Sequence, residues 1–96
     1  MLVTERHTER GLLVTVCDPD VLGETFEHGD VEFTVEESFY DGDHHEREAV
    51  RDALARANVA NLVGVDVVDL AVEEGYVDEA NVLDLDGTVH AQFVRL

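Results

Sequence analysis

Residues 44–57 read HHEREAVRDALARA, the clearest amphipathic segment of the chain. Its apolar residues recur at helical spacing and the charged residues lie opposite, as expected of a helix that covers a core. The apolar face consists of Ala49, Val50, Ala53, Leu54 and Ala57. Asp43 and Glu46 are spaced as in a capping box, so we expect this helix to begin at His44.

A second helix is predicted directly after it, from Asn58 to Glu74. It would bury Leu62, Val63, Val67, Leu70 and Ala71. Gly75 follows where a left-handed residue commonly ends a helix. Gly64 inside the segment costs about 1 kcal/mol relative to alanine, so either the helix begins later or a neighbour packs closely there.

Strand signals precede these helices. Leu2–Arg6 and Leu12–Cys17 are apolar, β-branched runs joined by a loop over residues 7–11. Asp18-Pro19 then favours a short helical turn, with Asp18 as N-cap and Pro19 at the first helical position. Thr25 to Glu27 is expected to be extended, and the alternation through Val31, Phe33 and Val35 predicts a half-buried strand.

Two further strands follow the helices, Val82–Leu85 and Thr88–Leu96. Asp86-Gly87 between them is a strong signal for a type I′ hairpin. Strand and helix signals segregate along the chain instead of alternating, which indicates an α+β fold. We therefore expect one domain over residues 1–96, with a mostly antiparallel sheet, two packed helices and a short helical turn.

The charge of the chain is unusual. Twenty-three Asp and Glu residues stand against six arginines and no lysine, giving a net charge of −17, while 45% of the residues are hydrophobic. The acids are spread over the chain and would repel one another at low ionic strength. At molar salt the Debye length falls to about 3 Å, so the composition favours a halophile with a salt-rich cytoplasm. A merely acidic mesophilic protein remains the alternative.

This composition excludes several classes. Ordinary basic nucleic-acid binders, polybasic membrane binders and membrane-spanning proteins do not fit it. In molar salt, however, RNA binding involves little counterion release, so an acidic surface does not exclude it. Cys17 is the only cysteine and is expected to be buried. The N-terminus lacks a signal-peptide pattern, so we expect a cytoplasmic location.

No motif for catalysis or for a cofactor is found. The acids and histidines of residues 41–46 match no metal-ligand spacing and fit a helix start better, so we predict no metal site. Ser38, Cys17 and His90 are nucleophile and base candidates, but none stands in a recognisable catalytic context. A phosphate-binding loop is absent.

Five uncharged or weakly charged polar residues stand out from the acidic background. They are Ser38, Tyr40, Asn61, His90 and Gln92. Each can be explained locally, by satisfying buried backbone groups, with Asn58 as a helix N-cap nearby. Together they would form a polar patch on which a partner could dock without repulsion from carboxylates.

Three segments resemble the archaeal "domain of unknown function 424" family. They are Glu37-Ser38-Phe39-Tyr40, Ala60-Asn61-Leu62-Val63-Gly64 and His90–Leu96, and Val16-Cys17-Asp18 with Leu22-Gly23 before Thr25-Phe26 fits the N-terminal part. This chain has Asp41-Gly42 where the family often has a glycine pair. The resemblance implies a small archaeal cytoplasmic protein of the haloarchaeal type, and it brings no established activity, ligand or catalytic residue.

Three hypotheses follow. The first is a non-enzymatic binding or adaptor domain whose partner is RNA or a protein of translation or RNA processing. The second is a small enzyme or ligand-binding protein with a pocket around Tyr40, His90 and Gln92. The third is a homodimer through an exposed edge strand, Leu2–Arg6 or Thr88–Leu96.

Overall fold

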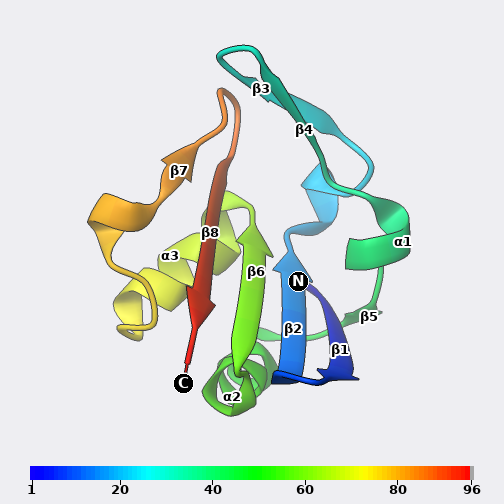
Figure 1. Ribbon diagram of the computed structural model, residues 1–96, viewed down its shortest axis with the longest axis vertical. Coiled ribbons are helices and arrows are strands. Elements are labelled where there is room, and N and C mark those ends of the chain that lie inside the picture. The colour runs from blue at the N-terminus through cyan, green and yellow to red at the C-terminus, as the bar shows by residue number, and fades with distance from the viewer. Residues whose placement is uncertain (96) are drawn as a thin grey trace.

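The computed structural model describes residues 1–95 (Figure 1). The strands of the main sheet are β1 (Leu2–Thr8), β2 (Gly11–Cys17), β5 (Asp43–His44), β6 (Val59–Val63), β7 (Leu83–Asp84) and β8 (Val89–Val94). The other elements are the hairpin strands β3 (Thr25–His28) and β4 (Val31–Thr34), the 3-10 helices η1 (Pro19–Val21) and η2 (Glu79–Asn81), and the helices α1 (Glu37–Tyr40), α2 (Arg47–Arg56) and α3 (Val65–Glu73). Within residues 1–95 no helix is long and apolar enough to cross a membrane.

The main sheet has six strands in the order β5-β1-β2-β6-β8-β7. β2 and β6 run parallel, and every other neighbouring pair is antiparallel. The two long helices lie behind the sheet in Figure 1, and the β3–β4 hairpin forms a separate two-stranded sheet. The predicted α+β class is therefore confirmed, including the mostly antiparallel sheet, the two packed helices and the short helical turn at Pro19.

Two apolar clusters hold these layers together. The larger lies between the sheet and α2 and α3, and it includes Val14, Leu62, Leu54 and Leu70 without solvent exposure. The smaller lies on the other face, beneath α1 and the hairpin. It consists of Cys17, Val21, Val35, Tyr40 and Val63. The second cluster is much smaller than the first, so it covers only one end of its sheet face.

Two predicted turns are confirmed. Asp86 and Gly87 join β7 to β8 with φ values of 52° and 123°, and positive φ at both positions is what a type I′ turn requires. Gly75 has a φ of 80° after α3, and the Tyr76 amide donates to the Ala71 carbonyl oxygen at 2.9 Å. Both turns rest on local chemistry that the sequence displays directly.

The prediction of a helix from Asn58 to Glu74 is wrong over residues 58–64. Residues 59–63 form β6 at the centre of the sheet, and α3 begins at Val65. Asn58 is no helix cap; its Oδ1 accepts a hydrogen bond from the Leu12 amide at 2.8 Å. Four of the five residues of this central strand are apolar, so periodicity does not distinguish it from a buried helix segment.

The predicted capping box is also wrong. Asp43 and His44 form β5, which pairs with Val3 and Leu2, and α2 begins only at Arg47. Glu46 is its N-cap and makes no side-chain cap bond. Asp43 and His44, which the sequence pattern assigns to the helix start, pair instead with the edge of β1. Backbone pairing with a distant strand thus overrides a local signal.

Candidate functional site

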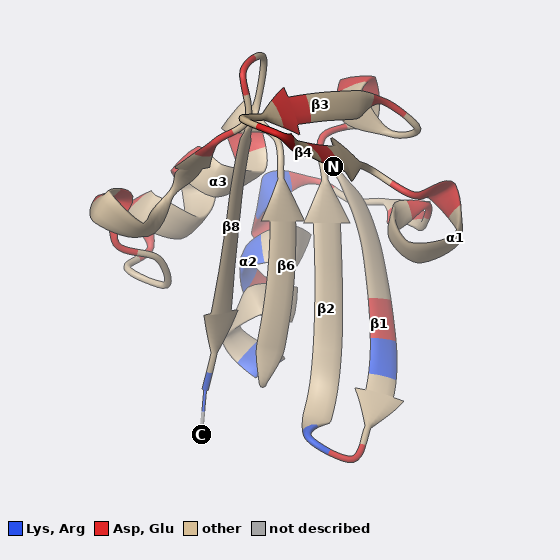
Figure 2. Ribbon diagram, turned by 45° about the horizontal axis from the view of Figure 1, so that its top comes forward, with Lys and Arg blue, Asp and Glu red and all other residues tan. Residues whose placement is uncertain are grey.

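The two faces of the main sheet are covered unequally. α2 and α3 cover one face, whereas α1 and the hairpin cover only the end of the other, where β2 and β6 finish (Figure 2). The rest of that second face is at the surface. We call it the open sheet face and define it as Arg6, Leu13, Val59, Asn61, Gln92 and Val94.

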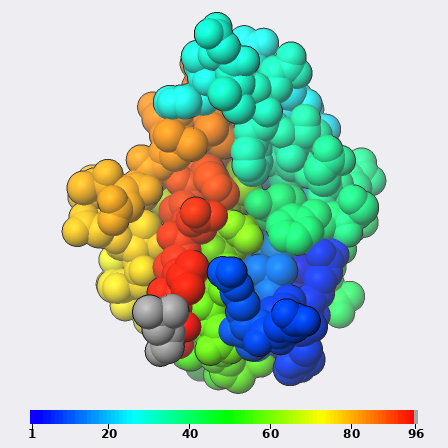
Figure 3. Space-filling view, viewed as in Figure 1, coloured from blue at the N-terminus to red at the C-terminus, as the bar shows by residue number. Residues whose placement is uncertain are grey.

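Strand register brings these six residues together from β1, β2, β6 and β8. Leu13 pairs with Arg6 on one side and Val59 on the other, and Val59 pairs with Val94. In the next row Asn61 pairs with Gln92. Figure 3 shows these four strands side by side at the surface, below the hairpin and α1. The open sheet face therefore has an aliphatic row beside an amide row.

Acidic residues are almost absent from this part of the protein. Of the 23 Asp and Glu residues, only Glu5 lies in β1, β2, β6 or β8. Its side chain is on the helix-covered side, where both carboxylate oxygens accept hydrogen bonds from Arg56 at 2.9 Å. Those bonds lower the pKa of Glu5 below its usual value. In Figure 2 strands β2, β6 and β8 carry no acidic colour, unlike the hairpin, α1 and α3.

The six arginines fall into two groups. Arg47, Arg51 and Arg56 on α2 each lie within 4.0 Å of a carboxylate. Within residues 1–95, the other three have no carboxylate at that distance, and they are Arg6, Arg10 and Arg95. Arg10 is the exposed tip of the β1–β2 turn, and Arg95 follows β8 directly. The arginines without acidic partners thus stand on or at the end of the open sheet face.

Arg6 and Arg95 have other contacts. The Arg6 guanidinium donates to the Ser38 carbonyl oxygen at 2.9 Å and lies 4.9 Å from the centre of the Phe39 ring. Arg95 donates to the Ala55 carbonyl oxygen at 2.8 Å. Arg10 and Arg95 also line a hollow of about 380 Å³, together with Val59 and Val94. Neutral partners leave the positive charge of these guanidinium groups uncompensated.

The polar residues singled out from the sequence are placed differently from one another. Asn61 and Gln92 are neighbours on the open sheet face. His90 lies one row further, half-buried, with its ring 5.0 Å from Phe33 and its Nδ1 donating to the Leu62 carbonyl oxygen at 2.9 Å. Ser38 is exposed on α1 at the border of this face.

Tyr40 does not lie on this surface. It is 5% exposed, within the smaller apolar cluster beside Cys17 and Val63. Burial raises the pKa of Tyr40 to about 12 and that of the Cys17 thiol to about 11. Both groups are therefore protonated at neutral pH, and Cys17 is the buried residue that the sequence predicts.

The pocket expected around Tyr40, His90 and Gln92 has no counterpart among four surface hollows within residues 1–95. None of the four is lined by any of these residues. Over the same part of the chain, no three His, Cys, Asp or Glu side chains are grouped so that they could hold a metal ion.

Four residues of the open sheet face were not predicted as site residues. They are Arg6, Leu13, Val59 and Val94. The sequence predicts a helix at Val59 and singles out the other three for no role beyond their strands. One sequence signal could have found three of them, Leu13, Val59 and Val94.

Residues 12–17, 58–64 and 88–95 contain no Asp or Glu, although acids make up 23 of the 96 residues. Three acid-free segments in so acidic a chain are the sequence signal for this surface. Because the segments are far apart along the chain, only the strand order β2-β6-β8 shows that they are neighbours.

The two edge strands predicted for a homodimer interface, β1 and β8, are each partly covered by a short strand. β5 pairs with Leu2 and Val3 of β1, and β7 pairs with Val89 and His90 of β8. Residues 4–8 of β1 and residues 91–94 of β8 have no strand on their outer side within the described chain. Leu96, at the end of the predicted last strand, lies outside the described residues. The homodimer stays a prediction.

Comparison with known proteins identifies first the fold and then the family. A search of the solved structures finds the same fold in a crystal structure of an uncharacterized conserved protein from Methanopyrus kandleri, with a TM-score of 0.79 and 22% sequence identity over 99% of this chain and 92% of that chain. The family model described as "Protein of unknown function (DUF424)" matches residues 5–96. The chain belongs to this family. A search of the curated proteins found no match.

Proposed function

We propose that this protein is a non-enzymatic binding module that docks single-stranded RNA on the open sheet face, in translation or RNA metabolism. One observation carries the proposal. In a chain with a net charge of −17, the three arginines without a carboxylate partner within residues 1–95 gather at the one surface from which acids are missing. An uncompensated positive charge beside an acid-free surface suits an anionic partner.

The other residues of the face favour RNA among anionic partners. The side-chain amides of Asn61 and Gln92 offer both donors and acceptors to the edges of unpaired bases. The Arg6 guanidinium, 4.9 Å from the Phe39 ring, offers a flat surface against which a base can stack. Arg10 is exposed and available to a phosphate. A peptide with acidic residues would use the arginines but not the paired amides in this way.

The charge of the whole protein sets the conditions for such binding. At low salt the distributed acids would repel RNA. At about 1 M salt the Debye length is about 3 Å, so only charges in direct contact with the RNA affect its binding. We infer a halophilic, archaeal setting with a salt-rich cytoplasm, for which the complete absence of lysine is the support. In that setting the contacts of the open sheet face decide affinity.

The test is a titration of a fluorescent, mixed-sequence, single-stranded RNA with the purified protein in about 1 M KCl. We expect Arg10→Gln to weaken binding by about threefold to tenfold, since it removes one phosphate contact. We expect Asn61→Ala and Gln92→Ala to weaken it as well. Arg47→Gln is the matched control, because it removes the same charge on α2, behind the sheet.

Three results would remove the basis of the proposal. The first is no RNA binding at any salt concentration by protein that circular dichroism shows to be folded. The second is equal weakening by Arg10→Gln and Arg47→Gln, which would indicate a dependence on net charge alone. The third is capture of a protein but no RNA by the purified chain, with the capture lost in Asn61→Ala and Gln92→Ala. That result would assign the open sheet face to a protein partner.

A further inference from the structure

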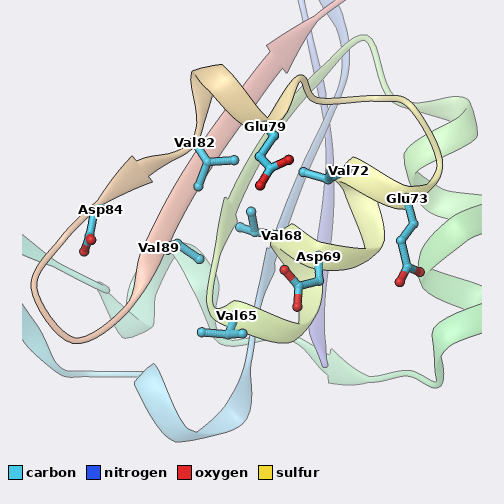
Figure 4. Close-up of a pocket in the computed structure, with 9 residues that line it drawn as sticks. All are labelled: Val65, Val68, Asp69, Val72, Glu73, Glu79, Val82, Asp84 and Val89. Atoms are coloured by element: carbon cyan, nitrogen blue, oxygen red, sulfur yellow. The ribbon is translucent and has the colours of Figure 1, made fainter.

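A second surface lies on the opposite side of the sheet, between α3 and the segment that runs from η2 to β8. It is a groove of about 460 Å³, within the size range of ligand sites. Val68, Val72, Val82 and Val89 form its floor, and Figure 4 shows these side chains pointing into the same space. Val65 at one end is 51% exposed, which is high for a valine next to an apolar cluster.

Carboxylates surround this floor. Asp69, Glu73, Glu79 and Asp84 line the groove, and no arginine or histidine does. Glu73 is paired with Arg47 at 2.8 Å. Within residues 1–95, Asp69, Glu79 and Asp84 have no cationic side chain within 4.0 Å. The groove therefore combines an apolar floor with three uncompensated negative charges.

We propose that this groove binds a lysine- or arginine-bearing apolar segment of a partner protein. The aliphatic stem of such a side chain packs along valines while its cationic head reaches the carboxylates, and neighbouring apolar side chains fill the rest of the floor. RNA is repelled by the same carboxylates. A second copy of this chain has no lysine, and its α2 arginines are already paired with acids. Its other arginines, Arg6, Arg10 and Arg95, lie on or at the end of the open sheet face and not in an apolar segment that could enter the groove.

This inference is independent of RNA binding. Val89 of the groove and Gln92 of the open sheet face project to opposite sides of β8, because successive strand residues alternate in direction. Two surfaces on opposite sides of one small domain would let it hold RNA and a protein segment at the same time. Each can fail without the other.

The experiment uses the folded chain and a short fluorescent peptide of leucine and lysine in an amphipathic helical pattern. A second peptide has glutamate in place of every lysine. We expect the leucine–lysine peptide to bind and the leucine–glutamate peptide not to bind. We expect Val65→Ser and Glu79→Gln each to weaken binding by about threefold to fivefold. Fluorescence anisotropy in low and molar KCl measures the binding of each peptide to the unchanged protein and to the two variants.

Matched controls repeat each change elsewhere on the surface. Val31→Ser changes another exposed valine, which lies on β4 and is 64% exposed, and Glu48→Gln changes an exposed acid on α2. Both should leave peptide binding unchanged, as should saturating RNA. The proposal is overturned if neither peptide binds, if both bind equally, or if the controls weaken binding as much as the groove variants. Self-association that Val65→Ser abolishes would assign the groove to a second copy and overturn it too.

Discussion

Asp18 acts on a helix that begins almost fifty residues later in the chain. Its carboxylate accepts hydrogen bonds from the amides of Asp66 at 2.8 Å and Val67 at 3.1 Å, the free donors at the start of α3. The sequence predicts Asp18 as the cap of the turn that follows it, but no side-chain cap bond forms at η1. Burial raises the pKa of Asp18, while the two amide donors act in the opposite direction.

Replacing Asp18 should therefore destabilise α3. We expect Asp18→Ala to lower the free energy of unfolding by about 2 kcal/mol, since it removes an N-cap and leaves buried amides without an acceptor. Asp18→Asn should cost less, because it keeps one acceptor oxygen and removes the desolvation of a buried charge. Urea unfolding measures all three proteins. Asp20→Ala, at an exposed position two residues away, is the control, and an equal loss there would contradict the assignment.

At the scale of elements, sequence patterns were reliable where a local signal has one structural meaning. The Asp86-Gly87 turn, Gly75 and the β1–β2 pair follow from such signals. The sequence does not predict β6, because Val59–Val63 is apolar except for Asn61 and shows no strict alternation, and its strand character depends on β2 and β8 beside it. β5 was missed because two residues carry no periodicity, and only the free edge of β1 explains them.

Gly64 marks the boundary between β6 and α3. Its φ of 122° is a conformation that side chains rarely adopt, and a Cβ atom there would overlap the Asp18 carboxylate. We expect Gly64→Ala to destabilise the protein by about 3 kcal/mol or more, through backbone strain and displacement of the cap. Gly29→Ala is matched in its positive φ, 63°, but has nothing within 4 Å of the added Cβ. Equal losses in thermal unfolding would exclude a role for Asp18.

The placement of the candidate site residues could be predicted only in part. The neighbours Asn61 and Gln92 are recognisable as polar residues in apolar segments, but their pairing needs the register of β6 against β8. Tyr40 resembles them in sequence, yet α1 turns it into the smaller apolar cluster. Which polar residues share a face is a property of the sheet, and no single segment contains that information.

For the whole molecule, the net charge of −17 predicts stability that depends on salt. We expect the thermal midpoint to rise between about 0.1 M and 1 M KCl, as the Debye length falls from about 10 Å to about 3 Å. Each kcal/mol gained should raise the midpoint by about 4–8 °C in a domain of this size. Calorimetry at both concentrations measures the change. A midpoint independent of KCl would favour the merely acidic mesophilic protein.

RNA binding on the open sheet face can be mapped residue by residue by NMR. Proton–nitrogen spectra of labelled protein in molar KCl report every backbone amide and the side-chain amides of Asn61 and Gln92. We expect added single-stranded RNA to shift the signals of those two side chains and of the amides of Arg10, Leu13 and Val94, and to leave those of α2 unchanged. Shifts confined to α2 and α3, or no shifts at RNA concentrations above the protein's, would contradict this expectation.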